Sequence, residues 1–290
     1  MTEHKIFCPA KINLFLEVTA RRADGYHELA TLFAKLNFGD NIILSLSPSE
    51  KTEISLSVTG PYAAAAPADE NNLVYKAAAR FFEFAGARAR CEIKLEKNIP
   101  AGAGLGGGSS DAGSLLRKLC EIYGVDVKKI LPPAAKLGAD VPLFLYKETL
   151  LRACGIGEIL TPVPLKNQNF YAVVSWPGVH VSTKEVFKRF TPASAPEILT
   201  TTSNLDNMIN ALSGGKPLSF WGKFLFNRLE SFTLPYVREA RELKAFMQTR
   251  SRCVMMTGSG STVFALLENK EDAVKLASEI KGAVVTRLAA

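Results

Sequence analysis

The sequence predicts an α+β protein of two domains. Stretches with apolar residues at every second position, typical of half-buried strands, are interspersed with stretches whose apolar residues recur at helical spacing. They follow one another without the regular alternation of an α/β fold, which favours the α+β class. A chain of 290 residues has room for two domains. Because residues 161–168 interrupt the periodicity, we expect one domain at 1–163 and another at 164–290.

The N-terminal part of the chain is predicted to be rich in strands. Residues 5–19 alternate in character, although Pro9 interrupts them, so they form one strand or two. A turn centred on Asp24-Gly25 follows. Two further strand regions and a low-complexity loop are then expected at 29–46, 54–58 and 63–68.

The middle of the chain is predicted to contain a helix, a strand and two more helices. Residues 71–85 carry an apolar stripe at helical spacing, and residues 90–96 alternate again. The next helix begins at Ser109–Asp111, which are favourable N-cap residue types. A further helix is expected at 126–136, and a turn at 138–142 then leads into a strand region.

The second half is predicted to open with a strand, continue through four helices and close with strand, turn, strand, helix and strand. In that order the expected elements are 170–175, 183–190, 204–212, 219–230, 236–248, 253–256, 262–267, 272–280 and 283–287.

Composition and charge restrict the class of function. The five cysteines are scattered and never spaced as Cys-x-x-Cys, so neither a metal cluster nor a disulfide framework is expected. No run of about 18 apolar residues occurs and the first residues are charged; we therefore expect no signal peptide, no membrane span and a cytoplasmic location. The net charge is +7, but the basic residues are dispersed, which favours a small anionic substrate over nucleic acid. A monomer or homodimer is expected.

The most informative stretch is Pro100–Ser110, a glycine-rich loop that leads into a predicted helix. Five of the seven residues at 102–108 are glycine, which supplies backbone that adopts positive φ and approaches a ligand closely. A helix N-terminus presents unpaired N–H groups and the positive end of the helix dipole, so the loop is predicted to bind phosphate. The alternative is a surface linker, but a strand and an apolar helix flank the loop.

Two common nucleotide loops do not fit. A Walker A loop ends in Gly-Lys-Ser/Thr, whereas this loop reads Gly-Gly-Ser-Ser and has no lysine. The spacing Gly102-x-Gly104-x-x-Gly107 matches the dinucleotide fingerprint, but that fingerprint requires a parallel strand after the helix. Residues 126–136 continue instead as a second helix, so the context argues against a Rossmann site.

Two side chains and a second loop are candidates for phosphoryl-transfer chemistry. Lys11 either stabilises charge on a transferred phosphoryl group or is a solvent-facing strand lysine. Asp140 is a lone carboxylate at a predicted helix-to-strand turn, where it either accepts a proton or caps the turn. Gly258–Ser261 is either a second surface close to the ligand or a tight hairpin turn.

These stretches resemble the galactokinase, homoserine kinase, mevalonate kinase and phosphomevalonate kinase (GHMP) superfamily. The segments that resemble its three motifs are Pro9–Leu14, Pro100–Ser110 and Thr257–Ser261. More narrowly, Arg22–His27 and Leu137–Pro142 resemble the kinases that act on 4-diphosphocytidyl-2-C-methyl-D-erythritol.

The resemblance implies a fold, a reaction and a set of roles. The implied fold is an ATP-binding N-terminal domain like ribosomal protein S5 domain 2, followed by a ferredoxin-like domain. The implied reaction is phosphorylation of the substrate's 2-hydroxyl by ATP with Mg²⁺, in the methylerythritol phosphate route to isoprenoids. Asp140 would be the catalytic base and Lys11 its neighbour. Cytidine contacts would come from Tyr26, His27 and Phe187, and Asn13 would lie by the erythritol. The implied ATP contacts are Asn72, Lys97, Pro100, Ala101, Gly102, Ala103, Gly104, Leu105, Gly106, Gly107, Gly108, Ser109 and Ser110.

One departure and two alternatives remain. Cys154 stands where the family pattern has a charged residue before Gly155-x-Gly157-Glu158. A GHMP kinase for another small alcohol, such as homoserine or mevalonate, is one alternative, but it would lack Tyr26-His27. A nucleic-acid-binding S5-like protein is the other, and it would not need the glycine loop, Lys11 and Asp140 together.

Overall fold

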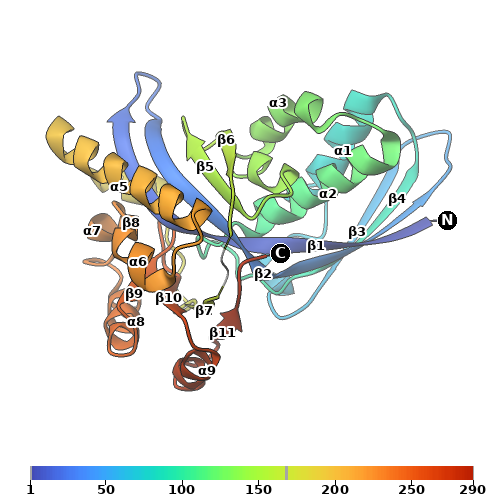
Figure 1. Ribbon diagram of the computed structural model, residues 1–290. Coiled ribbons are helices and arrows are strands. Elements are labelled where there is room, and N and C mark those ends of the chain that lie inside the picture. The colour runs from blue at the N-terminus through green and yellow to red at the C-terminus, as the bar shows by residue number, and fades with distance from the viewer. Residues whose placement is uncertain (1, 167–168, 290) are drawn as a thin grey trace. The chain divides into compact units, whose positions relative to one another are not determined.

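The computed structural model describes residues 2–166 and 169–289 and confirms the α+β class (Figure 1). The chain forms two compact units. Unit 1 comprises the residues up to Ala10, Gly39–Ala101 and Gly106–Lys147; unit 2 comprises Lys11–Phe38, Gly102–Leu105 and the chain from Glu148 onward. These units alternate along the chain, so a single division between residues 163 and 164 does not coincide with them. The division at residue 163 into an ATP-binding domain and a second domain stays a prediction. Asn167 and Gln168, in the predicted boundary, lie outside the described residues.

Unit 1 places helices against a sheet. Strand β4 (Arg90–Glu96) pairs antiparallel with the end of β2 (His27–Ser47) and parallel with β3 (Glu53–Thr59). The first residues of β1 (Thr2–Arg21) also belong to this unit. The remaining elements are α1 (Leu73–Ala85), α2 (Gly107–Tyr123), α3 (Val127–Leu137) and the 3₁₀ turns η1 (Ala63–Ala65) and η2 (Pro142–Leu145).

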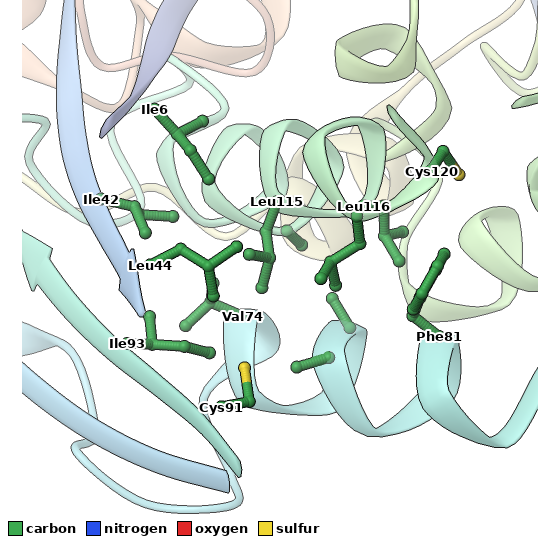
Figure 2. Close-up of a cluster of buried hydrophobic side chains, with 14 of the residues drawn as sticks. Ile6, Ile42, Leu44, Val74, Phe81, Cys91, Ile93, Leu115, Leu116 and Cys120 are labelled. Carbon is green, nitrogen blue, oxygen red and sulfur yellow. The ribbon is translucent and has the colours of Figure 1, made fainter. Parts of the chain in front are cut away.

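The core of unit 1 lies between the sheet and the helices (Figure 2). Apolar side chains at alternate positions of β4 meet the stripes of α1 and α2, as their periods of two and of three to four predict. Among the residues drawn are Ile6, Ile42, Leu44, Val74, Phe81, Cys91, Ile93, Leu115, Leu116 and Cys120.

Unit 2 contains parts of the large sheet and all of a second sheet. Residues Phe15 and Leu16 of β1 pair with β8 (Phe226–Asn227), Thr31–Ala34 of β2 pair with β5 (Leu150–Cys154), and β5 pairs with β6 (Ile159–Val163). The second sheet has the order β11 (Val284–Thr286), β7 (Tyr171–Ser175), β10 (Val263–Leu267), β9 (Cys253–Met256). Its helical elements are α4 (Thr183–Arg189), α5 (Ala195–Ser213), α6 (Leu218–Trp221), η3 (Gly222–Phe224), α7 (Glu230–Thr233), α8 (Arg238–Gln248) and α9 (Lys270–Ser278).

Several local predictions were wrong, each for a physical reason. The predicted helix at 219–230 is instead α6, η3, β8 and the start of α7. Its apolar spacing imitated a helix, but Gly222 packs so closely that a Cβ there would lie 2.3 Å from Cys253 Sγ. Residues 5–19, by contrast, lie in a single strand, one of the two expected alternatives, and Pro9 is within β1.

Two predicted boundaries near the glycine loop also moved. Helix α2 begins at Gly107, not at Ser109–Asp111, because Gly106 is the N-cap with a φ of 74° that favours glycine. The expected strand region after Asp140 is the 3₁₀ turn η2, so Asp140 lies between two helical elements.

One boundary in unit 2 moved as well: helix α5 begins at Ala195, earlier than the predicted 204.

Candidate active site

The glycine loop enters α2 as a phosphate cradle would. Gly102, Gly104 and Gly106 have positive φ, and the Ser110 amide donates to the Gly106 carbonyl at 2.8 Å as a first helical bond. The N–H groups at the start of a helix have no acceptor within it. A Cβ on Gly108 would meet nothing within 4 Å, so space is open beside this first turn. The backbone can therefore offer several donors to an anion.

Three buried ionisable side chains lie beside this helix start in unit 1. Lys97 Nζ donates to Asp111 Oδ2 at 2.7 Å and also to Asp40 Oδ2. All three side chains are buried. Burial, together with the charge of Asp40, raises the pKa of Asp111 to about 8 despite the opposing effect of Lys97. Burial would lower the pKa of Lys97, but the two carboxylates outweigh burial and raise it.

The turn that carries Asp140 lies against the first turns of α2. A Cβ on Gly113 would lie 2.5 Å from the Val141 carbonyl oxygen, so the absence of a side chain there permits the contact. A Cβ on Gly138 would lie 3.9 Å from Ser109 Oγ. Unit 1 therefore brings the predicted phosphate loop and the predicted base into one neighbourhood.

Asn72 has a role that the sequence analysis did not assign. Its Oδ1 accepts from the Val74 amide at 3.0 Å, and its Nδ2 donates to the Pro67 carbonyl at 2.7 Å. It is thus the N-cap of α1 and holds the preceding loop.

In unit 2, Lys11 and Asn13 form a buried polar pair. Lys11 is 5% exposed, so it is not a solvent-facing strand lysine. Its Nζ donates to Asn13 Oδ1 at 3.0 Å and lies 5.3 Å from the centre of the Phe33 ring. Asn13 is held in turn by Thr31 Oγ1 and Thr257 Oγ1, each at 2.9 Å. The ammonium is therefore oriented by its neighbours rather than mobile in water.

The second small-residue loop is part of the same neighbourhood. A Cβ on Gly258 would lie 3.5 Å from Lys11 Nζ, and one on Gly104 would lie 2.8 Å from the Thr257 carbonyl oxygen. The loop thus touches both Lys11 and the part of the glycine loop that belongs to unit 2. This contact favours the close-approach interpretation over an isolated hairpin turn.

A short segment, residues 179–183, ends at the first residue of α4, is hydrogen-bonded to the second loop and packs against the glycine loop. Ser261 Oγ donates to the Val179 carbonyl, and Thr183 Oγ1 lies 2.8 Å from Ser259 Oγ. The ring of His180 packs on Gly102, where a Cβ would lie 2.0 Å from His180 Cδ2.

The predicted cytidine residues divide into a stacked pair and an exposed ring. His27 stacks on Phe187 with centroids 4.7 Å apart and an angle of 23°, and Phe190 meets His27 edge-on. Tyr26 is 60% exposed. Burial and the nearby Arg21 lower the pKa of His27, which favours the neutral ring at neutral pH.

Sequence reasoning missed Asp40, Asp111, Thr183 and His180. By its residue type Asp111 is predicted to cap the helix, and the other three carry no local pattern. Their roles depend on contacts between residues up to 78 positions apart, as for His180 and Gly102. Within residues 2–166 and 169–289, no group of three His, Cys, Asp or Glu side chains is arranged to hold a metal ion, and no helix is long and apolar enough to cross a membrane.

Comparison with known proteins covers nearly the whole chain. The sequence profile of the GHMP kinases N terminal domain matches residues 72–148. A 4-diphosphocytidyl-2-C-methyl-D-erythritol kinase from Persephonella marina is 37% identical over 94% of each chain. One from Prosthecochloris aestuarii is 39% identical over 93% of this chain and 91% of its own.

Solved structures agree with these relatives. A crystal structure of 4-(cytidine 5'-diphospho)-2C-methyl-D-erythritol kinase has a TM-score of 0.78 and 35% identity, covering 99% of this chain and 100% of that one. The homoserine kinase from Cytophaga hutchinsonii has a TM-score of 0.77 at 22% identity, with 100% and 95% coverage, and shares the fold alone. The resemblance seen in the sequence motifs is thereby confirmed: this chain belongs to the 4-diphosphocytidyl-2-C-methyl-D-erythritol kinase family of the GHMP kinases.

Proposed function

We propose that this chain transfers the γ-phosphoryl group of ATP to the 2-hydroxyl of 4-diphosphocytidyl-2-C-methyl-D-erythritol, a step of the methylerythritol phosphate route to isoprenoids. The name shared by relatives at 37% and 39% identity supports the substrate. The observation that carries the proposal is the glycine-capped start of α2, with open space at Gly108 and the Asp140 turn beside Ser109. Phosphoryl transfer needs such a cradle, a cation and a group that orients the acceptor.

The proposed chemistry uses two side chains. Asp140 accepts or polarises the proton of the acceptor hydroxyl as general base. Lys11 stabilises the negative charge that develops as phosphate moves. The buried, hydrogen-bonded setting of Lys11 supports this role, because a fixed charge needs little reorganisation when the transition state forms.

The nucleotide is proposed to bind along Pro100–Ser110, with Asn72 near the adenine. Ser110 also ties this loop down, because its hydroxyl donates to the Pro9 carbonyl at 2.7 Å. Mg²⁺ commonly keeps several waters and binds through substrate phosphates plus one or two protein oxygens. Ser109, a half-buried residue at the start of α2, has a hydroxyl oxygen that fits such a ligand. The ion would neutralise phosphate charge.

The second substrate is proposed to bind through its cytosine. His27 and Phe187 offer a stacked aromatic surface, Tyr26 a second exposed ring, and His27 an edge for hydrogen bonds. Stacking contributes about 1–3 kcal/mol per base. Asn13 is proposed to lie near the erythritol.

The test is an ATP-dependent phosphorylation assay on the purified chain. The cytidine diphosphate ester should be the preferred acceptor. The kcat/KM for free methylerythritol should be lower by a factor of at least roughly 10², because this polyol has no base to stack and leaves hydrogen-bonding groups of the site without a partner. Homoserine and mevalonate serve as comparison alcohols. Asp140→Asn, which keeps the size of the side chain, should lower kcat by roughly 10²–10⁴. Equal activity on free methylerythritol would refute the cytidine assignment, and normal turnover by Asp140→Asn would refute the base.

A further inference from the structure

Asp40 holds the segment that leads into the glycine loop. Its carboxylate is completely buried. Oδ1 accepts from the backbone amides of Asn98 and Ile99, the latter at 2.8 Å, and Oδ2 accepts from Lys97. The loop starts at the next residue, Pro100. A single carboxylate therefore fixes three consecutive residues before the loop.

The same cluster holds the residues that follow the loop. Lys97 Nζ also donates to Asp111, in the second turn of α2, at 2.7 Å. Gly107, the first residue of α2, lies over this ammonium: a Cβ there would be 3.3 Å from Lys97 Nζ and 3.0 Å from Ile99 Cγ2. The entry and the exit of the loop are thus tied to one buried centre within unit 1.

We propose that Asp40 is a positioning residue for nucleotide binding, and that it acts by holding both ends of the loop Pro100–Gly106 at a fixed spacing through Lys97. The inference rests on the proposed function, because it concerns how the loop binds ATP phosphates. It also assigns the Lys97 side chain to the loop rather than to adenine.

The electrostatics favour a positioning role over a purely stabilising one. Burying three ionisable side chains carries a large desolvation cost, and buried ion pairs can often be replaced by apolar residues without loss of stability. Here the groups cannot be exchanged for apolar ones without loss of the bonds to Asn98, Ile99 and α2. Asp111 Oδ1 has no hydrogen-bond partner among the described residues, so the cluster is not arranged for greatest polar satisfaction. What the arrangement does provide is fixed geometry at the base of a loop that must present its amides precisely.

The experiment compares Asp40→Ala with Phe82→Ala. Phe82 lies on α1 in the core of unit 1 and is 2% exposed. Its truncation therefore destabilises unit 1 without removing any bond of Asp40, Lys97 or Asp111. Binding of a non-hydrolysable ATP analogue with Mg²⁺ is measured by calorimetry, thermal unfolding reports stability, and kinetics give KM for each substrate. Asp40→Ala should weaken analogue binding about tenfold or more and raise the KM for ATP, with little change in the KM for the cytidine substrate. Phe82→Ala should lower the unfolding temperature and leave analogue affinity unchanged.

Two further variants keep the proposal open to refutation. Asp40→Asn keeps one carbonyl oxygen for the two amides but loses the acceptor for Lys97, so its affinity should lie between those of Asp40→Ala and the unchanged chain. If Asp40→Ala does not fold, Asp111→Leu is tested in its place. Asp111→Leu removes the bond from Lys97 to α2 and leaves Asp40 in place, and it should also weaken binding of the analogue. A folded Asp40→Ala or Asp111→Leu protein with the affinity of the unchanged chain overturns the inference. If the unchanged chain itself binds no ATP analogue, the proposed function fails instead.

Discussion

At the scale of single residues, Asp111 is a buried group whose ionisation affects stability. Burial raises its pKa to about 8, whereas an Asp in an unfolded chain titrates near about 3.9. The folded state therefore binds this proton more tightly than the unfolded state. Its contribution to stability is complete below about pH 4 and is lost as pH rises towards about 8. At about 1.4 kcal/mol per pKa unit, the loss is on the order of a few kcal/mol.

We therefore expect Asp111→Asn to reduce the pH dependence of unfolding. The amide imitates the protonated acid in size and neutrality, so the variant should match the unchanged chain near about pH 4 and be more stable than it near about pH 8.5. Thermal unfolding across that range measures the difference. Parallel curves for the two proteins would show that Asp111 does not hold the proton.

The sequence suggested some of these residues and could not suggest others. Lys11 and Asp140 stood out because each is a charge in an otherwise apolar or small-residue setting. The burial of Lys11 and its bond to Asn13 follow from the packing of β1 with Thr31 and Thr257, which no spacing in residues 9–14 encodes. Asp40 carries no local pattern, and its bonds to residues 97–99 form only in the folded chain.

At the scale of elements, residues 179–183 connect α4 with both glycine-containing loops. The segment reaches Ser261, Ser259 and Gly102, and it continues into the helix that carries Phe187.

Long elements such as α1, α2 and β4 were predictable from the sequence, because their apolar periods extend over several turns or residues. Short elements such as α6, η3 and β8 were not, because two to four residues carry too little pattern and tertiary contacts decide them.

We expect Gly102→Ala to disturb the phosphate loop in two separable ways. The positive φ of 65° costs an alanine about 1–2 kcal/mol, and its Cβ would displace the ring of His180. Gly178→Ala is the matched control, because its φ of 82° carries the same penalty while a Cβ there would meet nothing within 4 Å.

A double-mutant cycle with His180→Ala isolates the contact. ATP-analogue affinity should fall severalfold in Gly102→Ala and recover in part in the double variant, but Gly178→Ala should bind nearly as the unchanged chain does. Additive effects in the cycle would mean that the His180 ring moves aside without a cost in affinity and that only the strained backbone at residue 102 weakens binding.

At the scale of the whole molecule, the two units share β1, β2 and the glycine loop along the chain. The sequence suggested a cut near residue 163 because residues 161–168 lose periodicity. Residues 159–163 are in fact the strand β6, paired with β5. A linear reading cannot detect that Lys11–Phe38 belongs with residues beyond 148, because such pairing leaves no trace in local composition.

This arrangement predicts the behaviour of a fragment ending at residue 163. Unit 1 would be intact, but unit 2 would be cut. Glu17, which is fully buried, would lose Arg228 Nε and Nη2, each at 2.8 Å. Leaving one partner of a buried ion pair uncompensated costs about 3–5 kcal/mol. Phe15 and Leu16 would lose β8, and Asn13 would lose Thr257.

Hydrogen exchange on the fragment distinguishes the outcomes. Amides of β3, β4 and α2 should stay protected, and Thr31–Ala34 should keep the protection that pairing with β5 gives within the fragment. Amides around Phe15 and Leu16 should exchange faster than in the full chain, because β8 is absent. Adding a separate chain of residues 164–290 should restore protection if the two pieces reassemble. A fragment whose residues 11–38 are protected as in the full chain would instead establish 1–163 as an independent domain.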